Sequence, residues 1–331
     1  MRNFDYHRAT SLPDAVRQLS THDGWQVLAG GTTMIDLLKL DVEQPKGLVD
    51  ITGLAELQGL QVGAGSIRFG ALARMADVGD DKTLRSACPA LSESLWKAAS
   101  PQLRHSARLG GNILQRTRCP YFRDTSYECN KREPGSGCAA LDGGLTHLHA
   151  ILGGSKACVA MYPGDWAQAL IAFDAVVSTV SAAGTRRIPF ADLHRLPGNS
   201  PEVETPLKRG EIVTMIEVPV VAAMKGSHYL KARDRESYAF AAVSAAVGLA
   251  LDGDRISDSR IALGGVAAKP WRASTAEAVL KGKVFSEALA REAGRAAFAD
   301  ATPLKDSAYK IALGADVVAG ALMTAHQRAK G

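Results

Sequence analysis

Residues 25–40 read Trp-Gln-Val-Leu-Ala-Gly-Gly-Thr-Thr-Met-Ile-Asp-Leu-Leu-Lys-Leu, and this stretch decides how the first part of the chain folds. The apolar run 25–29 predicts a short buried strand, and the apolar positions of 34–40 predict a helix. The Gly-Gly-Thr-Thr turn at 30–33 joins them. Backbone N–H groups at such a turn can bind a diphosphate, and glycine allows close approach. The order matches neither the phosphate-loop nor the G-x-G-x-x-G motif, so a plain structural turn remains an alternative.

A second glycine turn has the sequence Leu109-Gly110-Gly111-Asn112. It follows a polar stretch that contains Gln102 and Arg104, and it leads directly into a region rich in cysteine. Two glycine turns can bind one extended dinucleotide from both sides, because each presents backbone N–H groups to an anion. The pair therefore favours a nucleotide site more strongly than either turn alone.

The rest of the chain predicts an α+β protein with domains in series. Residues 11–14 form a capping box that begins a helix, and 60–69 predicts a hairpin. From 101 to about 154 the periodicity fails, and a loop of that length is usually functional or disordered. The proline-rich residues 197–206 predict a linker. Beyond it we expect strands at 211–218, 229–232, 239–251 and 257–263, followed by helices at roughly 274–281, 285–299 and 307–328.

Composition excludes several classes of protein. The chain has 331 residues, 46% of them hydrophobic, and a formal charge of +5, values typical of a globular protein. No Lys/Arg run is interleaved with aromatic residues, so we expect no nucleic-acid partner. We also expect no signal peptide and no membrane-spanning segment, because no apolar stretch is long enough. No Ser-His-Asp or paired-carboxylate pattern supports hydrolysis.

Four of the five cysteines lie within forty residues of one another. Cys119, Cys129 and Cys138 are separated by nine and eight positions on a loop broken by glycine and proline, and Cys158 follows. Four thiolates complete the ligand set of a [4Fe-4S] or [2Fe-2S] cluster. Structural zinc sites tend to use close C-x2-4-C pairs, which are absent here. Spacing alone leaves an iron–sulfur cluster, a zinc site and unligated cysteines as the three interpretations.

Three other residues that could bind a metal ion are not expected to do so. Cys88 is distant in sequence from the other cysteines, so we predict a buried, apolar role for it. His147 and His149 alternate and could bind a metal ion, but two histidines without a ligand role are the favoured interpretation.

Together these motifs resemble the FAD-binding subunit of the molybdenum hydroxylases, the xanthine dehydrogenase and aldehyde oxidoreductase family. The likeness covers essentially the whole chain and includes the two glycine turns and the later stretches Leu-Gly-Gly-Val-Ala at 263–267 and Lys-Pro-Trp-Arg at 269–272. Residues 115–122 and 134–140 resemble the branch that carries a [4Fe-4S] cluster in this subunit, the heterotrimeric, periplasmic-type aldehyde oxidoreductases.

The resemblance implies a fold and domain boundaries. It implies an α+β protein with a two-part FAD-binding domain of the vanillyl-alcohol-oxidase (PCMH) type over residues 1–200, divided into subdomains at about 1–56 and 57–200. The iron–sulfur loop would occupy 113–160 of this domain. A C-terminal domain of the CO dehydrogenase flavoprotein type would follow over 207–331.

The resemblance also implies individual site residues, and no catalytic residue among them. The family's usual Ser-Asp pair is Gly164-Asp165 here, which keeps the carboxylate. The basic residue near the flavin ring matches Lys231. The cluster ligands would be Cys119, Cys129, Cys138 and Cys158. The FAD contacts would be Leu28, Ala29, Gly30, Gly31, Thr32, Thr33, Arg104, Gly110, Gly111, Asn112, Thr117, Asp165 and Lys231.

By resemblance the chain passes electrons in an aldehyde-oxidising heterotrimer. They come from a molybdenum-cofactor subunit and a [2Fe-2S] subunit, and they leave through FAD to an external acceptor. The resemblance implies a periplasmic location by co-export with a signal-bearing partner, with the cytoplasm as the alternative. The other candidate functions are a stand-alone FAD-dependent oxidase, a xanthine dehydrogenase-type subunit with a different substrate, and a structural subunit that binds zinc.

Overall fold

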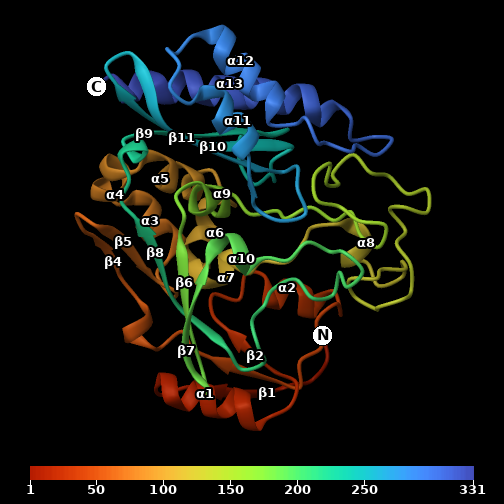
Figure 1. Cartoon of the computed structure of the whole chain (residues 1–331). Helices are drawn as coiled ribbons and strands as arrows, with labels where there is room; N and C mark the ends of the chain where they lie inside the picture. The colour runs from red at the N-terminus through yellow and green to blue at the C-terminus, as the bar shows by residue number, and fades with distance from the viewer.

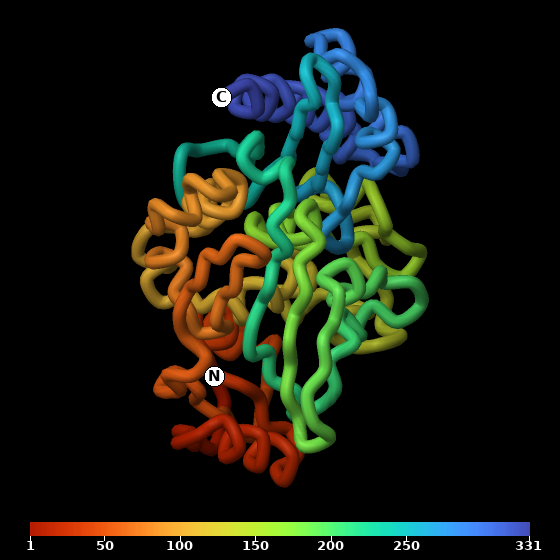
Figure 2. Tube along the Cα trace, turned by 60° about the vertical axis from the view of Figure 1, so that its left-hand side comes forward, coloured from red at the N-terminus to blue at the C-terminus, as the bar shows by residue number.

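The computed structural model describes residues 1–331 and contains three β-sheets. The sheets follow one another along the length of the molecule, from the N-terminal region at one end to the C-terminal helices at the other (Figures 1 and 2). No helix combines the length and the apolar character that crossing a membrane requires.

The N-terminal subdomain is a parallel three-stranded sheet with two helices. Its strand order is β1 (Asp5–Arg8), β3 (Gly47–Asp50) and β2 (Trp25–Leu28). Helix α1 (Leu12–Thr21) is capped by Ser11, whose Oγ accepts a hydrogen bond from the Asp14 amide at 3.2 Å. Helix α2 (Met34–Lys39) follows β2 after the glycine turn, which confirms the predicted order of strand, turn and helix.

An antiparallel five-stranded sheet forms the second subdomain. Its order is β4 (Leu60–Val62), β5 (Ser66–Gly70), β8 (Ile212–Pro219), β6 (Val176–Ser181) and β7 (Gly184–Pro189). Phe69 of β5 meets Trp166 edge-to-face, with ring centroids 5.2 Å apart, in the buried core beneath the sheet. The helices of this subdomain are α3 (Met75–Asp80), α4 (Lys82–Ala87), α5 (Pro89–Trp96), α6 (Pro101–Ser106), α7 (Leu109–Ile113), α9 (Trp166–Ala172) and α10 (Phe190–Leu193).

Two expectations change in this subdomain. Strand β8 pairs with β5 and β6 in the middle of the sheet, so the FAD-binding part extends past the boundary predicted between residues 200 and 207. Helices α6 and α7 lie in the stretch expected to be loop. Ser100 caps α6, and the Gly110 N–H group of α7 donates a hydrogen bond to the Ala71 carbonyl oxygen.

The C-terminal domain is an antiparallel sheet covered by helices. Its strand order is β12 (Trp271–Arg272), β11 (Arg255–Gly264), β10 (Val243–Asp252) and β9 (Gly226–Ala232). The three predicted helices form as α11 (Ser274–Leu280), α12 (Glu287–Ala296) and α13 (Tyr309–Ala329). Helix α13 packs on β9 and β10, whereas α5 and α9 of the preceding subdomain pack on the sheet from below in Figure 1.

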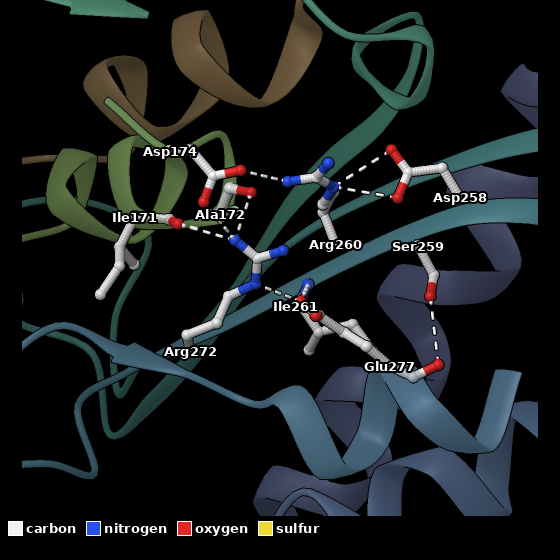
Figure 3. A network of polar contacts seen from close by, with 9 residues as sticks. All are labelled: Ile171, Ala172, Asp174, Asp258, Ser259, Arg260, Ile261, Arg272 and Glu277. Atoms are coloured by element: carbon white, nitrogen blue, oxygen red, sulfur yellow. Dashed lines mark hydrogen bonds and ion pairs between the residues drawn. The ribbon is translucent and has the colours of Figure 1, made fainter. Parts of the chain in front are cut away.

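An arginine network joins this domain to the preceding one (Figure 3). The Arg272 guanidinium donates to the Ile171 and Ala172 carbonyl oxygens at 3.1 and 2.9 Å, at the end of α9. It also lies 3.0 Å from the Asp174 carboxylate, which pairs with Arg260 as well. The network satisfies the carbonyl groups that a helix end leaves free, so it fixes α9 to β11 and β12.

Residues 114–165 contain one short helix, α8 (Pro120–Arg123), and an isolated bridge between Cys129 and Cys138. The proline-rich stretch 197–206 packs against this segment instead of acting as a free linker. Its Glu204 carboxylate pairs with Arg116 and, at 3.0 Å, with Lys131.

Candidate functional site: two glycine turns and a cysteine cavity

The turn that follows β2 presents free backbone donors. None of the five amides from Ala29 to Thr33 donates a hydrogen bond to another group of the protein. Gly31 has a φ of 72°, a conformation that residues with a side chain rarely adopt. A Cβ atom on Gly30 would lie 2.2 Å from the Ser106 carbonyl oxygen, so only glycine allows the turn to approach the end of α6. The turn therefore offers several free backbone N–H groups that can donate to an anionic group such as a diphosphate.

The second glycine turn forms the start of α7 and lies close to the first. The Gly110 amide donates to the Ala71 carbonyl oxygen at 2.8 Å, and a Cβ at Gly110 would lie 3.0 Å from the Ala71 Cβ. A Cβ at Gly111, by contrast, would meet no heavy atom within 4 Å. The Asn112 Oδ1 atom is buried and accepts no hydrogen bond. Because buried polar atoms are normally paired, Asn112 fits a residue that binds a ligand.

The side chains of two other predicted FAD contacts, Arg104 and Thr117, form hydrogen bonds within the protein. Arg104 donates to the Ala98 carbonyl oxygen at 2.8 Å. The buried Thr117 hydroxyl donates to the Met161 carbonyl oxygen at 2.8 Å and accepts from the Cys119 amide at 3.2 Å. Thr117 thus orients the chain immediately before the first cysteine of the loop.

Asp165 and Lys231 form a buried pair with each other. The Lys231 Nζ atom lies 2.9 Å from the Asp165 carboxylate and also donates to the Lys97 carbonyl oxygen at 3.0 Å. The Tyr229 hydroxyl donates to the same carboxylate at 2.5 Å. Burial raises the pKa of Asp165, while Lys231 and Tyr229 oppose the increase. The sequence indicated the two charged residues but not Tyr229. Tyr229 reaches the pair because side chains two positions apart on a strand, here 229 and 231, lie on the same face of the sheet.

The four predicted cysteine ligands meet around one small cavity. Cys119, Cys129, Cys138 and Cys158 all line it, and none forms a disulfide. The Ala160 amide donates to Cys158 Sγ at 3.4 Å. Burial raises the pKa of the Cys158 thiol, and the nearby Lys131 ammonium partly offsets this increase. The fifth cysteine, Cys88, is fully buried in the core of the second subdomain, as predicted.

The structure adds His149 to this cavity. Its Nε2 atom lies 3.3 Å from Cys119 Sγ, and its ring is buried. Burial lowers the pKa of His149 to about 4, so the ring is neutral at physiological pH. The alternation of His147 and His149 in the sequence was the available signal, but it could not show which ring faces the cysteines.

The side chains that line the cysteine cavity include four thiols and the His149 ring. No group of three or more His, Cys, Asp and Glu side chains in the structure is close enough to hold a single metal ion. A tetrahedral zinc site needs four sulfur atoms about 2.3 Å from one point.

A further cavity of about 490 Å³ adjoins the cysteine segment. Thr117 and Cys158 form part of its wall, and stretch 195–207 forms another part. Its charged side chains balance one another: Arg116 pairs with Glu43 and Glu204.

Comparison with known proteins shows the class of protein that this fold and these turns define. The family of the FAD binding domain in molybdopterin dehydrogenase matches residues 2–221, and that of the CO dehydrogenase flavoprotein C-terminal domain matches 227–329. The chain belongs to this family: it is an FAD-binding oxidoreductase subunit of the molybdenum hydroxylase class. Both matches divide the chain after β8, as the sheets do.

Individual relatives agree with this assignment. The chain is 42% identical over 332 residues to the aldehyde oxidoreductase FAD-binding subunit PaoB of Escherichia coli K12, covering 99% of this chain and 100% of that protein. It is 28% identical to the glyceraldehyde dehydrogenase medium chain of Sulfolobus acidocaldarius, over 87% of this chain and 85% of that protein. In the solved carbon monoxide dehydrogenase of Hydrogenophaga pseudoflava, a chain aligns with a TM-score of 0.78 and 26% identity, over 99% of this chain and 98% of that chain.

The residues present fit FAD at the two glycine turns. The free amides of 29–33 suit the diphosphate, and Asn112 offers an unpaired buried oxygen beside the open space at Gly111. When bound, FAD supplies transfer of one or two electrons. The contribution of the chain is to bind the cofactor and to orient it.

Proposed function

We propose that this chain is the FAD- and [4Fe-4S]-binding electron-transfer subunit of a molybdenum-dependent aldehyde oxidoreductase. Its partners are a molybdenum-cofactor subunit, where aldehyde oxidation takes place, and a [2Fe-2S] subunit. Electrons leave the complex through this chain to an external acceptor. The full-length similarity to an aldehyde oxidoreductase subunit supports this substrate class.

The observation that carries the proposal is the convergence of four cysteines, up to 39 positions apart (158 minus 119), on one cavity. Cys119, Cys129 and Cys138 lie on a loop, and Cys158 reaches them from the segment that returns to the core. A [4Fe-4S] cluster takes four thiolates, which is the number of cysteines that line this cavity.

Turnover measurements test the assigned role. We expect the purified full chain to bind FAD and to be inactive towards aldehydes, and the complex co-purified with its partners to oxidise them. Aldehyde oxidation by the chain alone would instead indicate a stand-alone flavin oxidase. A co-purified complex that oxidises purines but no aldehyde would indicate a xanthine dehydrogenase-type subunit.

We further propose a periplasmic location, reached by co-export with a partner that carries the signal. The resemblance to the periplasmic-type branch supports it. Cell fractionation tests it: the chain should appear in the periplasmic fraction when the partners are present, and should remain in the cytoplasm when the partner's signal is deleted. A chain that stays cytoplasmic in both cases would contradict the proposal.

A further inference from the structure

The segment that follows the first glycine turn makes three contacts with the loop that carries Cys119, Cys129 and Cys138, which we call the cysteine loop. Helix α2 begins at Met34, directly after the turn whose amides are free. The contacts lie on α2 and on the residues just after it. The cysteine loop runs beside this helix (Figure 1).

The first contact is a pair of ionic interactions between Asp36 of α2 and two arginines on either side of Cys119. The Asp36 carboxylate accepts from Arg118 at 2.8 Å through Oδ2 and from Arg123 at 2.9 Å through Oδ1. Arg118 precedes the first cysteine of the cavity, and Arg123 ends α8, which follows it. One carboxylate thus pairs with an arginine on each side of Cys119.

The second contact is apolar. Leu37, Phe122 and Cys129 form a small buried cluster, and Cys119 packs against it. Because Leu37 belongs to α2, this helix and two of the four cysteines share one apolar cluster.

The third contact is an ion pair just beyond the helix. Glu43, four residues after the end of α2, pairs with the Arg116 guanidinium, which Glu204 also binds. All three side chains are partly buried, and they lie in the wall of the adjoining cavity. The Arg116–Glu43 pair holds the chain three residues before Cys119. Together with the Asp36 pairs, it ties this part of the chain to α2 and the residues just after it.

From these three contacts we infer that α2 couples the two cofactor sites, with Asp36 as the positioning residue that links the glycine turn to the Cys119 segment. Ordering of the turn by FAD and ordering of the loop by the cluster then favour each other, because both fix the same helix. By linkage the effect is reciprocal: the cluster tightens FAD binding as much as FAD tightens cluster binding. The inference rests on the proposed function, since it requires the cluster.

A double-mutant cycle on the full chain tests the coupling. FAD dissociation constants are measured by flavin fluorescence for the wild type, Cys138→Ser, Asp36→Asn and the double variant. Cys138 is chosen because it lies outside the Leu37 cluster. We expect loss of the cluster to weaken FAD binding about fivefold in the wild-type background. In the Asp36→Asn background the same loss should leave FAD binding nearly unchanged.

Asp41→Asn is the matched control. Asp41 follows the same helix, but its carboxylate pairs at 3.0 Å with Arg2 and has no contact with the cysteine loop. Its φ of 57° is a conformation that asparagine also adopts readily. In the Asp41→Asn background the wild-type effect of cluster loss should persist in full.

A second measurement covers the case in which Asp36→Asn cannot hold the cluster. Wild-type protein is equilibrated with an iron chelator, with and without saturating FAD, and the iron that remains bound is measured. FAD should increase the retained iron, and equal retention would overturn the inference. A cycle in which Asp36→Asn leaves the coupling intact would overturn it as well. A wild-type chain without iron and sulfide would refute the proposed function itself, whereas a cluster without coupling refutes only this inference.

Discussion

The Lys231 ammonium lies 2.9 Å from the Asp165 carboxylate, and the pair joins the two domains of the protein. Asp165 precedes α9 of the FAD-binding part, whereas Lys231 lies on β9 of the C-terminal domain. Both side chains are almost fully buried, with exposed fractions of 5% and 1%. The two residues predicted as separate FAD contacts therefore also hold the domains together.

Replacing Asp165 by Asn should destabilise the protein strongly. The substitution leaves the Lys231 charge buried without a counter-charge, which costs about 3 kcal/mol. Urea unfolding of the full chain measures this loss. The control is Glu287→Gln, because Glu287 pairs with Arg291 on an exposed helix surface, where a pair contributes less than about 0.5 kcal/mol. Equal stability of Asp165→Asn and the wild type would contradict the buried pairing.

Gly111→Ala should separate cofactor binding from folding. The added methyl group meets no protein atom within 4 Å, and alanine favours a helix, so the FAD-free chain should be as stable as the wild type or slightly more so. If FAD occupies that space, its affinity should fall about 5- to 150-fold, because overpacking costs roughly 1–3 kcal/mol.

Gly65→Ala provides the matched control for this experiment. Its added methyl group also meets no atom within 4 Å, but Gly65 lies in the hairpin between β4 and β5, away from both glycine turns. FAD titration should give wild-type affinity for Gly65→Ala. Wild-type affinity for Gly111→Ala would place FAD elsewhere.

Glu93 should control part of the stability at acidic pH. Its carboxylate accepts from Arg328 at 2.7 Å and from the Tyr229 amide at 2.9 Å, and it lies 2.8 Å from His228. Burial alone would raise its pKa, but these partners outweigh burial and lower the pKa from 4.5 to about 2. The stabilisation is therefore complete above pH 4.5 and is lost as the pH falls towards 2.

Glu93→Gln should remove this pH dependence. Its stability should be roughly 2 kcal/mol below that of the wild type at neutral pH, and the difference should shrink as the pH falls from about 5 to about 3. Urea unfolding across this range measures the difference, and Glu292→Gln on the exposed face of α12 is the control. A difference that stays constant with pH would show that Glu93 is not ionised in the way described.

Local features of the fold were predictable from the sequence. The strand, glycine turn and helix of 25–40 form as expected, because apolar periodicity and glycine determine them over a short span. The four cysteines of the cavity could also be grouped, since three of them share one loop and the fifth cysteine, Cys88, is distant in sequence.

Features that depend on distant pairing were not predictable. Strand β8 joins the second subdomain because it pairs with β5, about 150 residues earlier, and no local pattern reports such a partner. The role of Asp36 was missed for the same reason: an acidic residue on a short helix is ordinary until Arg118 and Arg123 are placed beside it. Thr117 stays a predicted FAD contact, and the structure adds that its hydroxyl donates to the Met161 carbonyl oxygen.

Iron and acid-labile sulfide analysis of the anaerobically purified full chain tests the central claim most directly. We predict about four iron atoms and four sulfide ions per chain for the wild type and for Cys88→Ala, whose thiol lies far from the cavity. Cys158→Ser should lose most of both. One zinc ion without iron, or a Cys158→Ser variant that keeps its full iron content, would contradict the assignment of the four cysteines to a [4Fe-4S] cluster.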